Sequence, residues 1–229
     1  MKGALLMKTS YNNPIRFWSI TSGISLFIMA IAAGYAYGFS FSKIYVENNS
    51  LQTMTNIQSN STIFYSGAIA WCLILVADII VSYGLYRYLK PSHKLIALIS
   101  GSLRLTYSIF LAIGIAFLFA KNTEIFLRIW SLGLFVFGFH LIITGIGVFL
   151  STETPNLLGF LLIIAGIGYS LIHGLQNFIP QATTFSTYLE TFLTIPMTVG
   201  ELSFGIWLFI KGGRKISQQP SNAPVPDAP

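Results

Sequence analysis

The sequence predicts an all-α integral membrane protein that crosses the bilayer six times as one helical bundle. Hydrophobic residues make up 54% of the chain and charged residues only 9%, whereas soluble domains carry about 25% charge. The mean hydropathy is +0.70. The apolar residues gather in runs of about 20 residues, the length that a helix needs to cross about 30 Å of hydrocarbon. Most of the chain is therefore expected to be surrounded by lipid.

Six apolar runs define the predicted spans. Most connectors between them are too short for a soluble domain, so neighbouring helices are expected to pack antiparallel. The connector at 40–65 is longer and rich in Asn, Ser and Thr. The predicted spans are Phe17–Phe39, Ser66–Leu89, Leu95–Ala120, Ile125–Leu150, Leu157–Phe178 and Leu189–Ile210.

The distribution of Lys and Arg predicts the orientation, because short positively charged loops stay cytoplasmic. With the N-terminus inside, the outer side keeps only Lys43, Lys121 and Arg128. We therefore expect a cytoplasmic segment at 1–16, a transmembrane domain at 17–211 and a Pro-rich, disordered cytoplasmic tail at 212–229. The inner side collects Lys2, Lys8, Arg16, Arg87, Lys90, Lys94, Lys211, Arg214 and Lys215.

An alternative interpretation of the N-terminal region is a cleaved signal peptide. A basic start precedes an apolar stretch over Lys2–Ala33 that contains Ala30 and Ala32. The apolar run is longer than the usual core of such a signal, about 7–15 residues. A retained first helix is therefore the favoured reading.

Charge and cysteine content exclude several classes of function. The formal charge of +6 comes from residues at the ends of apolar segments, and no basic patch interleaved with aromatic residues favours nucleic-acid binding. Cys72 is the single cysteine, so no intramolecular disulfide can form. The expected partner is the lipid bilayer, and not a nucleic acid.

Four ionisable residues lie near the middle of their predicted spans: Asp78, Arg104, His140 and Glu201. An ionisable side chain in hydrocarbon costs about 2.5–3.5 kcal/mol on insertion scales, so it usually faces the bundle interior and has a partner. These four define the candidate midplane site. Polar residues at helical spacing extend its faces, and the secondary candidates are Tyr107, Ser108, Thr198 and His173.

The charges of the midplane site predict a bound proton. Asp78, Arg104 and Glu201 together would carry one excess negative charge, which low-dielectric surroundings oppose. A proton on Glu201 or on His140 would neutralise it, so the site is expected to bind a proton or a small molecule. Two alternatives remain: a network that only fixes helix packing, and an intramembrane enzyme with His140 as base and Glu201 as acid.

Other chemistries have weaker support in the sequence. The histidines His140 and His173 fall at different depths, which disfavours a shared haem, and three histidines in total barely supply a zinc site. No GxSxG elbow or phosphate-binding P-loop occurs. We therefore predict neither a metal nor a cofactor.

Three segments resemble the bacterial family called domain of unknown function 4386. They are DIIVSYGLYRYLKPSHKLIALISGSLRLTYSIFLA from Asp78, FGFHLIITGIGVFLSTETPNLLGFLLIIAGIGYSLIHGL from Phe137, and GELSFGIWLFIKG from Gly200. The resemblance runs over 16–213 and includes all four midplane residues. It implies a small polytopic protein of a bacterial inner membrane and implies no substrate. At His173 the family pattern suggests an acidic residue, which weakens any role for this histidine.

Overall fold

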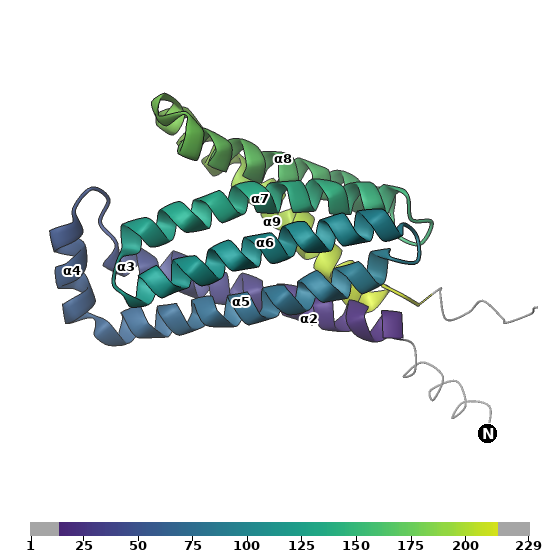
Figure 1. The fold of residues 1–229 in the computed structure, drawn as a ribbon, viewed down its shortest axis with the longest axis horizontal. Coiled ribbons are helices and arrows are strands. Elements are labelled where there is room, and N and C mark those ends of the chain that lie inside the picture. Colours follow the sequence, from purple (N-terminus) through teal and green to yellow (C-terminus); the bar gives the residue numbers. More distant parts are fainter. Residues whose placement is uncertain (1–13, 215–229) are drawn as a thin grey trace, which may run out of the picture.

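A computed structural model describes residues 14–214, apart from the side chains of Pro180 and Thr183, as an all-helical bundle (Figure 1). Six stretches of helix in this part of the chain are long and apolar enough to cross a membrane, which confirms the predicted fold class. Most of the predicted segment 1–16 and nearly all of the predicted disordered tail lie outside the described residues. The principal helices are α2 (Pro14–Ala33), α5 (Ser61–Leu89), α6 (Lys94–Phe119), α7 (Thr123–Phe149), α8 (Asn156–Phe178) and α9 (Thr183–Ile210).

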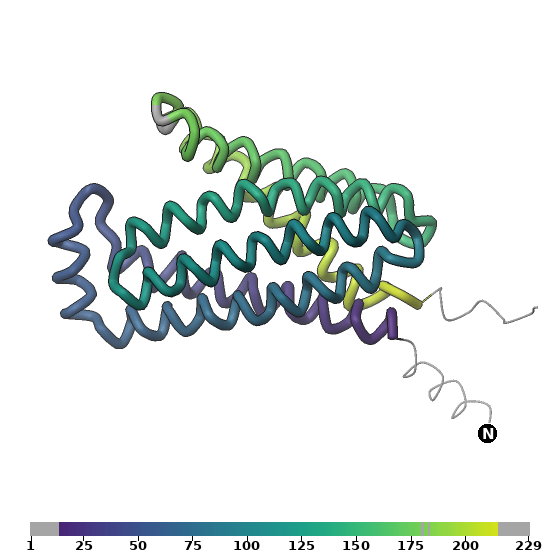
Figure 2. The backbone as a smooth tube through the Cα atoms, viewed as in Figure 1, coloured from purple at the N-terminus to yellow at the C-terminus, as the bar shows by residue number. Residues whose placement is uncertain are grey.

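The six long helices form a closed ring. Each packs against the next along the chain, and α9 returns to pack against α2. Neighbours run antiparallel, so the start of α2 and the end of α9 lie at the same end of the bundle (Figure 2). Side chains that point inward from any helix therefore face a common interior.

The connector between the first two spans is largely helical, which the sequence did not predict. The first span continues from α2 through a π-helix, η1 (Gly34–Phe41), and the single turn α3 (Ser42–Ile44). A separate helix, α4 (Ser50–Ser59), then lies across the ends of the long helices (Figure 1). Asn49 caps α4 by accepting a hydrogen bond from the backbone N–H of Gln52 at 3.0 Å. The spans were predicted from apolar runs, and α4 is polar, so this criterion could not indicate it.

Glycines bring α7 and α8 into close contact. A Cβ on Gly166 would lie 2.5 Å from the carbonyl oxygen of Gly138, and one on Gly159 would lie 2.9 Å from that of Gly145. Small residues are the usual means of close helix packing in lipid, because they let backbones approach one another. The α7–α8 pair thus forms a tightly packed side of the ring.

Arg16 of α2 joins the first long helix to the end of the last one, α9. Its guanidinium donates hydrogen bonds to the carbonyl oxygens of Phe209 at 2.7 Å and Gly212 at 2.8 Å, and longer ones to Leu208 and Ile210. The last carbonyls of a helix have no partner within the helix and attract a cation. Arg16 on the first helix therefore caps the last one.

Replacing Gly166 with Ala should loosen the α7–α8 contact. The new methyl group would clash with backbone, and overpacking of this kind costs about 1–3 kcal/mol. The melting temperature in detergent should fall. Gly34→Ala is the matched control, because its methyl group would meet nothing within 4 Å. Equal melting temperatures for the two variants would contradict the proposed role of the glycine contact.

Replacing Arg16 with Gln should weaken the contact between α2 and α9 and so lower the free energy of unfolding. Hydrogen bonds from a charged donor contribute about 1.5–3 kcal/mol each at most, and partial exposure of Arg16 reduces the loss to about 1–2 kcal/mol. Arg87→Gln provides the control, since Arg87 bonds only to Tyr83 of its own helix among the described contacts. Thermal unfolding should separate the variants, and an unchanged Arg16→Gln midpoint would refute the capping role.

Candidate functional site

A buried ion pair joins α5 to α6 at the centre of the ring. Nη2 of Arg104 lies 2.6 Å from Oδ1 of Asp78, and the two side chains are 1% and 0% exposed. Ser108, one turn after Arg104, donates a hydrogen bond to Oδ2 of Asp78 at 2.5 Å. The structure thus brings together three of the residues selected from the sequence, and the ion pair carries no net charge.

His140 of α7 is held between this pair and the backbone of α6. Its Nδ1 lies 2.9 Å from the carbonyl oxygen of Ser100, and its Nε2 lies 3.2 Å from Nη1 of Arg104. A carbonyl only accepts and a guanidinium only donates, so Nδ1 carries the hydrogen and Nε2 accepts. This geometry requires a neutral imidazole whose two nitrogens are both engaged. It therefore disfavours both the imidazolium and the catalytic base that the sequence left open.

Arg104 has more donors than the described residues use. Besides Asp78 and His140, its guanidinium contacts the sulfur of Met29 at 3.8 Å and the ring of Phe137, whose centroid is 5.1 Å away. Within residues 14–214 its Nε has no hydrogen-bond partner. A guanidinium has five N–H groups, and leaving one unpaired in a buried place is costly. A water molecule or another acceptor would complete its set.

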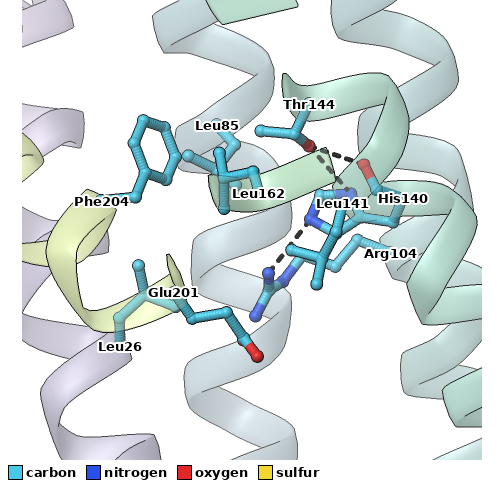
Figure 3. Close-up of a pocket in the computed structure, with 9 residues that line it drawn as sticks. All are labelled: Leu26, Leu85, Arg104, His140, Leu141, Thr144, Leu162, Glu201 and Phe204. Carbon is cyan, nitrogen blue, oxygen red and sulfur yellow. Dashed lines mark hydrogen bonds between the residues drawn. The ribbon is translucent and has the colours of Figure 1, made fainter. Parts of the chain in front are cut away.

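A small cavity lies beside Arg104, and Glu201 reaches into it from α9. Figure 3 shows the Glu201 side chain extending toward the guanidinium, with no hydrogen bond between the two among the residues drawn. The cavity has room for about one water molecule. Glu201 interacts with the hydroxyl of Tyr169 on α8. The cavity is lined by Leu26, Leu85, Arg104, His140, Leu141, Thr144, Leu162, Glu201 and Phe204.

The secondary candidates divide into two groups. Ser108 belongs to the site, and the buried Tyr107 adjoins it by packing its ring 5.0 Å from that of Phe137. Thr198 does not belong, because its side chain is exposed and bonds back to the carbonyl of Thr194 at 2.8 Å. Thr198 and Glu201 lie about 60° apart around the helix at 100° per residue, which is enough to put one outside the ring.

His173 lies apart from the four midplane residues. It is buried in a second group, the distal cluster, at the α7, α8 and α9 interface. This separation agrees with the doubt that the sequence placed on His173 as a member of the midplane site. The distal cluster consists of Ser131, His173, Gln176, Asn177 and Glu190.

Sequence reasoning missed two aromatic residues of the site. Tyr169 meets Glu201. Phe137 packs against Arg104, His140 and Tyr169, with its ring centroid 5.5 Å from that of His140 and 5.3 Å, edge to face, from that of Tyr169. The spacing carried a signal, since Phe137 precedes His140 by one turn on the same face. An aromatic residue in an apolar run has no charge to make it stand out.

The chain belongs to the family described as domain of unknown function (DUF4386), whose sequences it matches over residues 21–212. This confirms the resemblance seen in the sequence. A protein of Archaeoglobus fulgidus (strain ATCC 49558 / DSM 4304 / JCM 9628 / NBRC 100126 / VC-16), described as "Uncharacterized protein", is 34% identical over 146 residues, covering 64% of this chain and 83% of that protein. No solved structure matches the chain.

Breaking the ion pair should destabilise the bundle, and removing both charges should restore it. Arg104→Leu leaves Asp78 buried without its cation, a loss of about 3–5 kcal/mol for buried pairs. Adding Asp78→Asn removes the orphaned charge and should recover much of the lost thermal stability in detergent. The double mutant is expected to have a higher melting temperature than Arg104→Leu alone. A melting temperature lower still would mean that the two residues contribute independently, since the losses of independent sites add.

Proposed function

We propose that this member of the family is a proton-linked binding protein, in which Glu201 carries the proton and a small polar solute occupies the site beside Arg104. The observation that carries the proposal is the charge arrangement around the cavity. Asp78 and Arg104 neutralise each other at 2.6 Å, and His140 is neutral in its hydrogen-bonded position. An ionised Glu201 would therefore add an uncompensated charge to a low-dielectric site.

The spare donor of Arg104 supports the binding of a polar solute. Arg104, whose Nε is unpaired among the described residues, and Glu201 both line the cavity, together with the polar side chains of His140 and Thr144. In the described conformation the cavity admits water only, so a larger solute would require the surrounding helices to separate. Proton uptake at Glu201 would change the charge that this solute meets.

We also propose that the protein lies in the inner membrane of a bacterium with both termini in the cytoplasm. Most of the described basic residues gather at the end of the bundle where α2 begins and α9 ends, while the opposite end carries Lys43, Lys121 and Arg128. Short loops rich in Lys and Arg stay in the cytoplasm.

A second candidate is a purely architectural role for the polar residues. It is favoured by the interlocking contacts among α5, α6 and α7: Ser82 donates to the carbonyl of Gly101 at 2.9 Å, and the Ser100 hydroxyl lies 2.7 Å from that of Thr144. Such bonds stabilise membrane proteins by only about 0.6 kcal/mol on average. They account for helix packing and give no reason for Glu201 to reach toward Arg104.

The test is infrared detection of the proton on Glu201. Wild-type protein in liposomes at neutral pH should show the C=O band of a protonated carboxylic acid, and Glu201→Gln should lose it. Glu124→Gln, a change of the same chemistry at an exposed glutamate, should keep it. If the band is missing from the wild type or survives in Glu201→Gln, then Glu201 does not hold the proton and the proposal is wrong.

A further inference from the structure

The distal cluster lies between the midplane and the end of the bundle opposite the termini. Nδ1 of His173 is 2.9 Å from the hydroxyl of Ser131 and 3.0 Å from Oε1 of Gln176. The amide of Gln176 also donates to Oε2 of Glu190 at 3.2 Å. Asn177 donates to the Ser131 hydroxyl at 2.7 Å. A buried histidine is thus connected through one amide to a carboxylate on α9.

Tyr169 connects the distal cluster to the midplane site. It precedes His173 by one turn on α8, and the two rings stack with centroids 6.2 Å apart and planes 16° from parallel. Its hydroxyl interacts with Glu201. One residue therefore adjoins both clusters, which otherwise come from different depths of the bundle.

The two carboxylates lie at opposite ends of this chain of groups. Glu190 and Glu201 are eleven residues apart on α9, or about 16 Å at 1.5 Å per residue. Glu190 and Gln176 are partly exposed, whereas His173 is 9% exposed. Tyr169 and Glu201 are also partly exposed, so His173 is the most buried of these groups, which run from near the start of α9 toward its middle. Apolar side chains would pack this helix interface without the cost of burying an imidazole.

We propose that Glu190, His173 and Tyr169 form the path by which protons reach Glu201 from the end of the bundle opposite the termini. This inference rests on the proposed function, in which Glu201 binds a proton. Gln176 and Ser131 position the imidazole and do not themselves relay, since an amide gives up its hydrogen poorly. The path needs a water molecule in each of two gaps, one between Glu190 and the His173 ring and one between that ring and the Tyr169 hydroxyl.

The chemistry of each group suits a relay. An imidazole has one nitrogen that donates and one that accepts, and a phenol does both through its oxygen. Nδ1 of His173 donates to Oε1 of Gln176, so the ring takes the incoming proton on the free lone pair of Nε2 and gives a proton up again from Nε2. The phenol takes a proton on its oxygen and releases the one that it held. No oxidant or further reactant is needed, and the path returns to its starting protonation.

The charged groups near the path lie at its two ends, around Glu190 and around Glu201. Glu190 is faced by Tyr37 of η1 and by Gln176, and the contacts of His173 come from Ser131, Tyr169, Gln176 and Asn177. The charged and titratable groups around Glu201 are Asp78, Arg104, Tyr107, His140 and Tyr169. A proton that leaves Glu190 therefore crosses neutral groups until it reaches the midplane site.

The experiment follows exchange of the Glu201 proton for deuterium. The C=O band of Glu201 is the one that Glu201→Gln lacks. Proteoliposomes are switched from H2O to D2O, and infrared spectroscopy follows how fast this band shifts downward as deuterium replaces the proton. Tyr169→Phe and His173→Leu should slow this shift by about 100-fold, the lower end of what one positioned proton-transfer group contributes. Tyr169→Phe keeps the ring, so it remains informative should His173→Leu fold poorly.

The matched controls are Tyr188→Phe and His93→Leu, which remove the same groups at exposed positions. Both should exchange at the wild-type rate. A persistent band with wild-type exchange in Tyr169→Phe and His173→Leu would overturn the path while leaving the proton on Glu201 in place. A band missing from the wild type would overturn the proposed function and the path with it.

Discussion

A charged side chain in hydrocarbon requires a partner, and the Arg104 guanidinium shows how the bundle meets this constraint. Asp78 supplies the opposite charge from α5, His140 accepts a hydrogen bond on α7, and Phe137 covers the cation with its ring. Each partner comes from a helix that must keep its depth and rotation for the contact to exist. The position of one cation thus fixes the relative placement of three helices.

The ring arrangement explains why such contacts can converge. Because each helix has one neighbour on either side, and α9 meets α2, every helix keeps one face for the interior and exposes the rest to lipid. Close glycine contacts on the α7–α8 side bring the aromatic residues Phe137 and Tyr169 together. Tight packing and polar chemistry therefore occupy the same part of the bundle.

The sequence predicted the six spans, and it singled out Asp78, Arg104, His140 and Glu201, because both inferences use one variable, the position of a residue along an apolar run. Depth follows from counting residues along an apolar run. The sequence did not predict α4, which is polar. Nor did it predict that Thr198 lies outside the candidate site, which depends on the rotation of α9 within the ring. Nor did it reveal that Tyr169 meets Glu201, since a contact between helices depends on which faces meet. Rotation and hydrogen-bond register are set by the assembled bundle.

The seam between α2 and α9 has a consequence for biosynthesis. Arg16 is made 196 residues before Gly212, the last residue whose carbonyl group it caps. At about 5–20 residues per second, the ribosome needs roughly 10–40 s to cover that interval. During insertion the first five helices must therefore persist as an open arc, with one edge awaiting the sixth. Insertion of the sixth helix, and not of any earlier one, is the event that closes the ring.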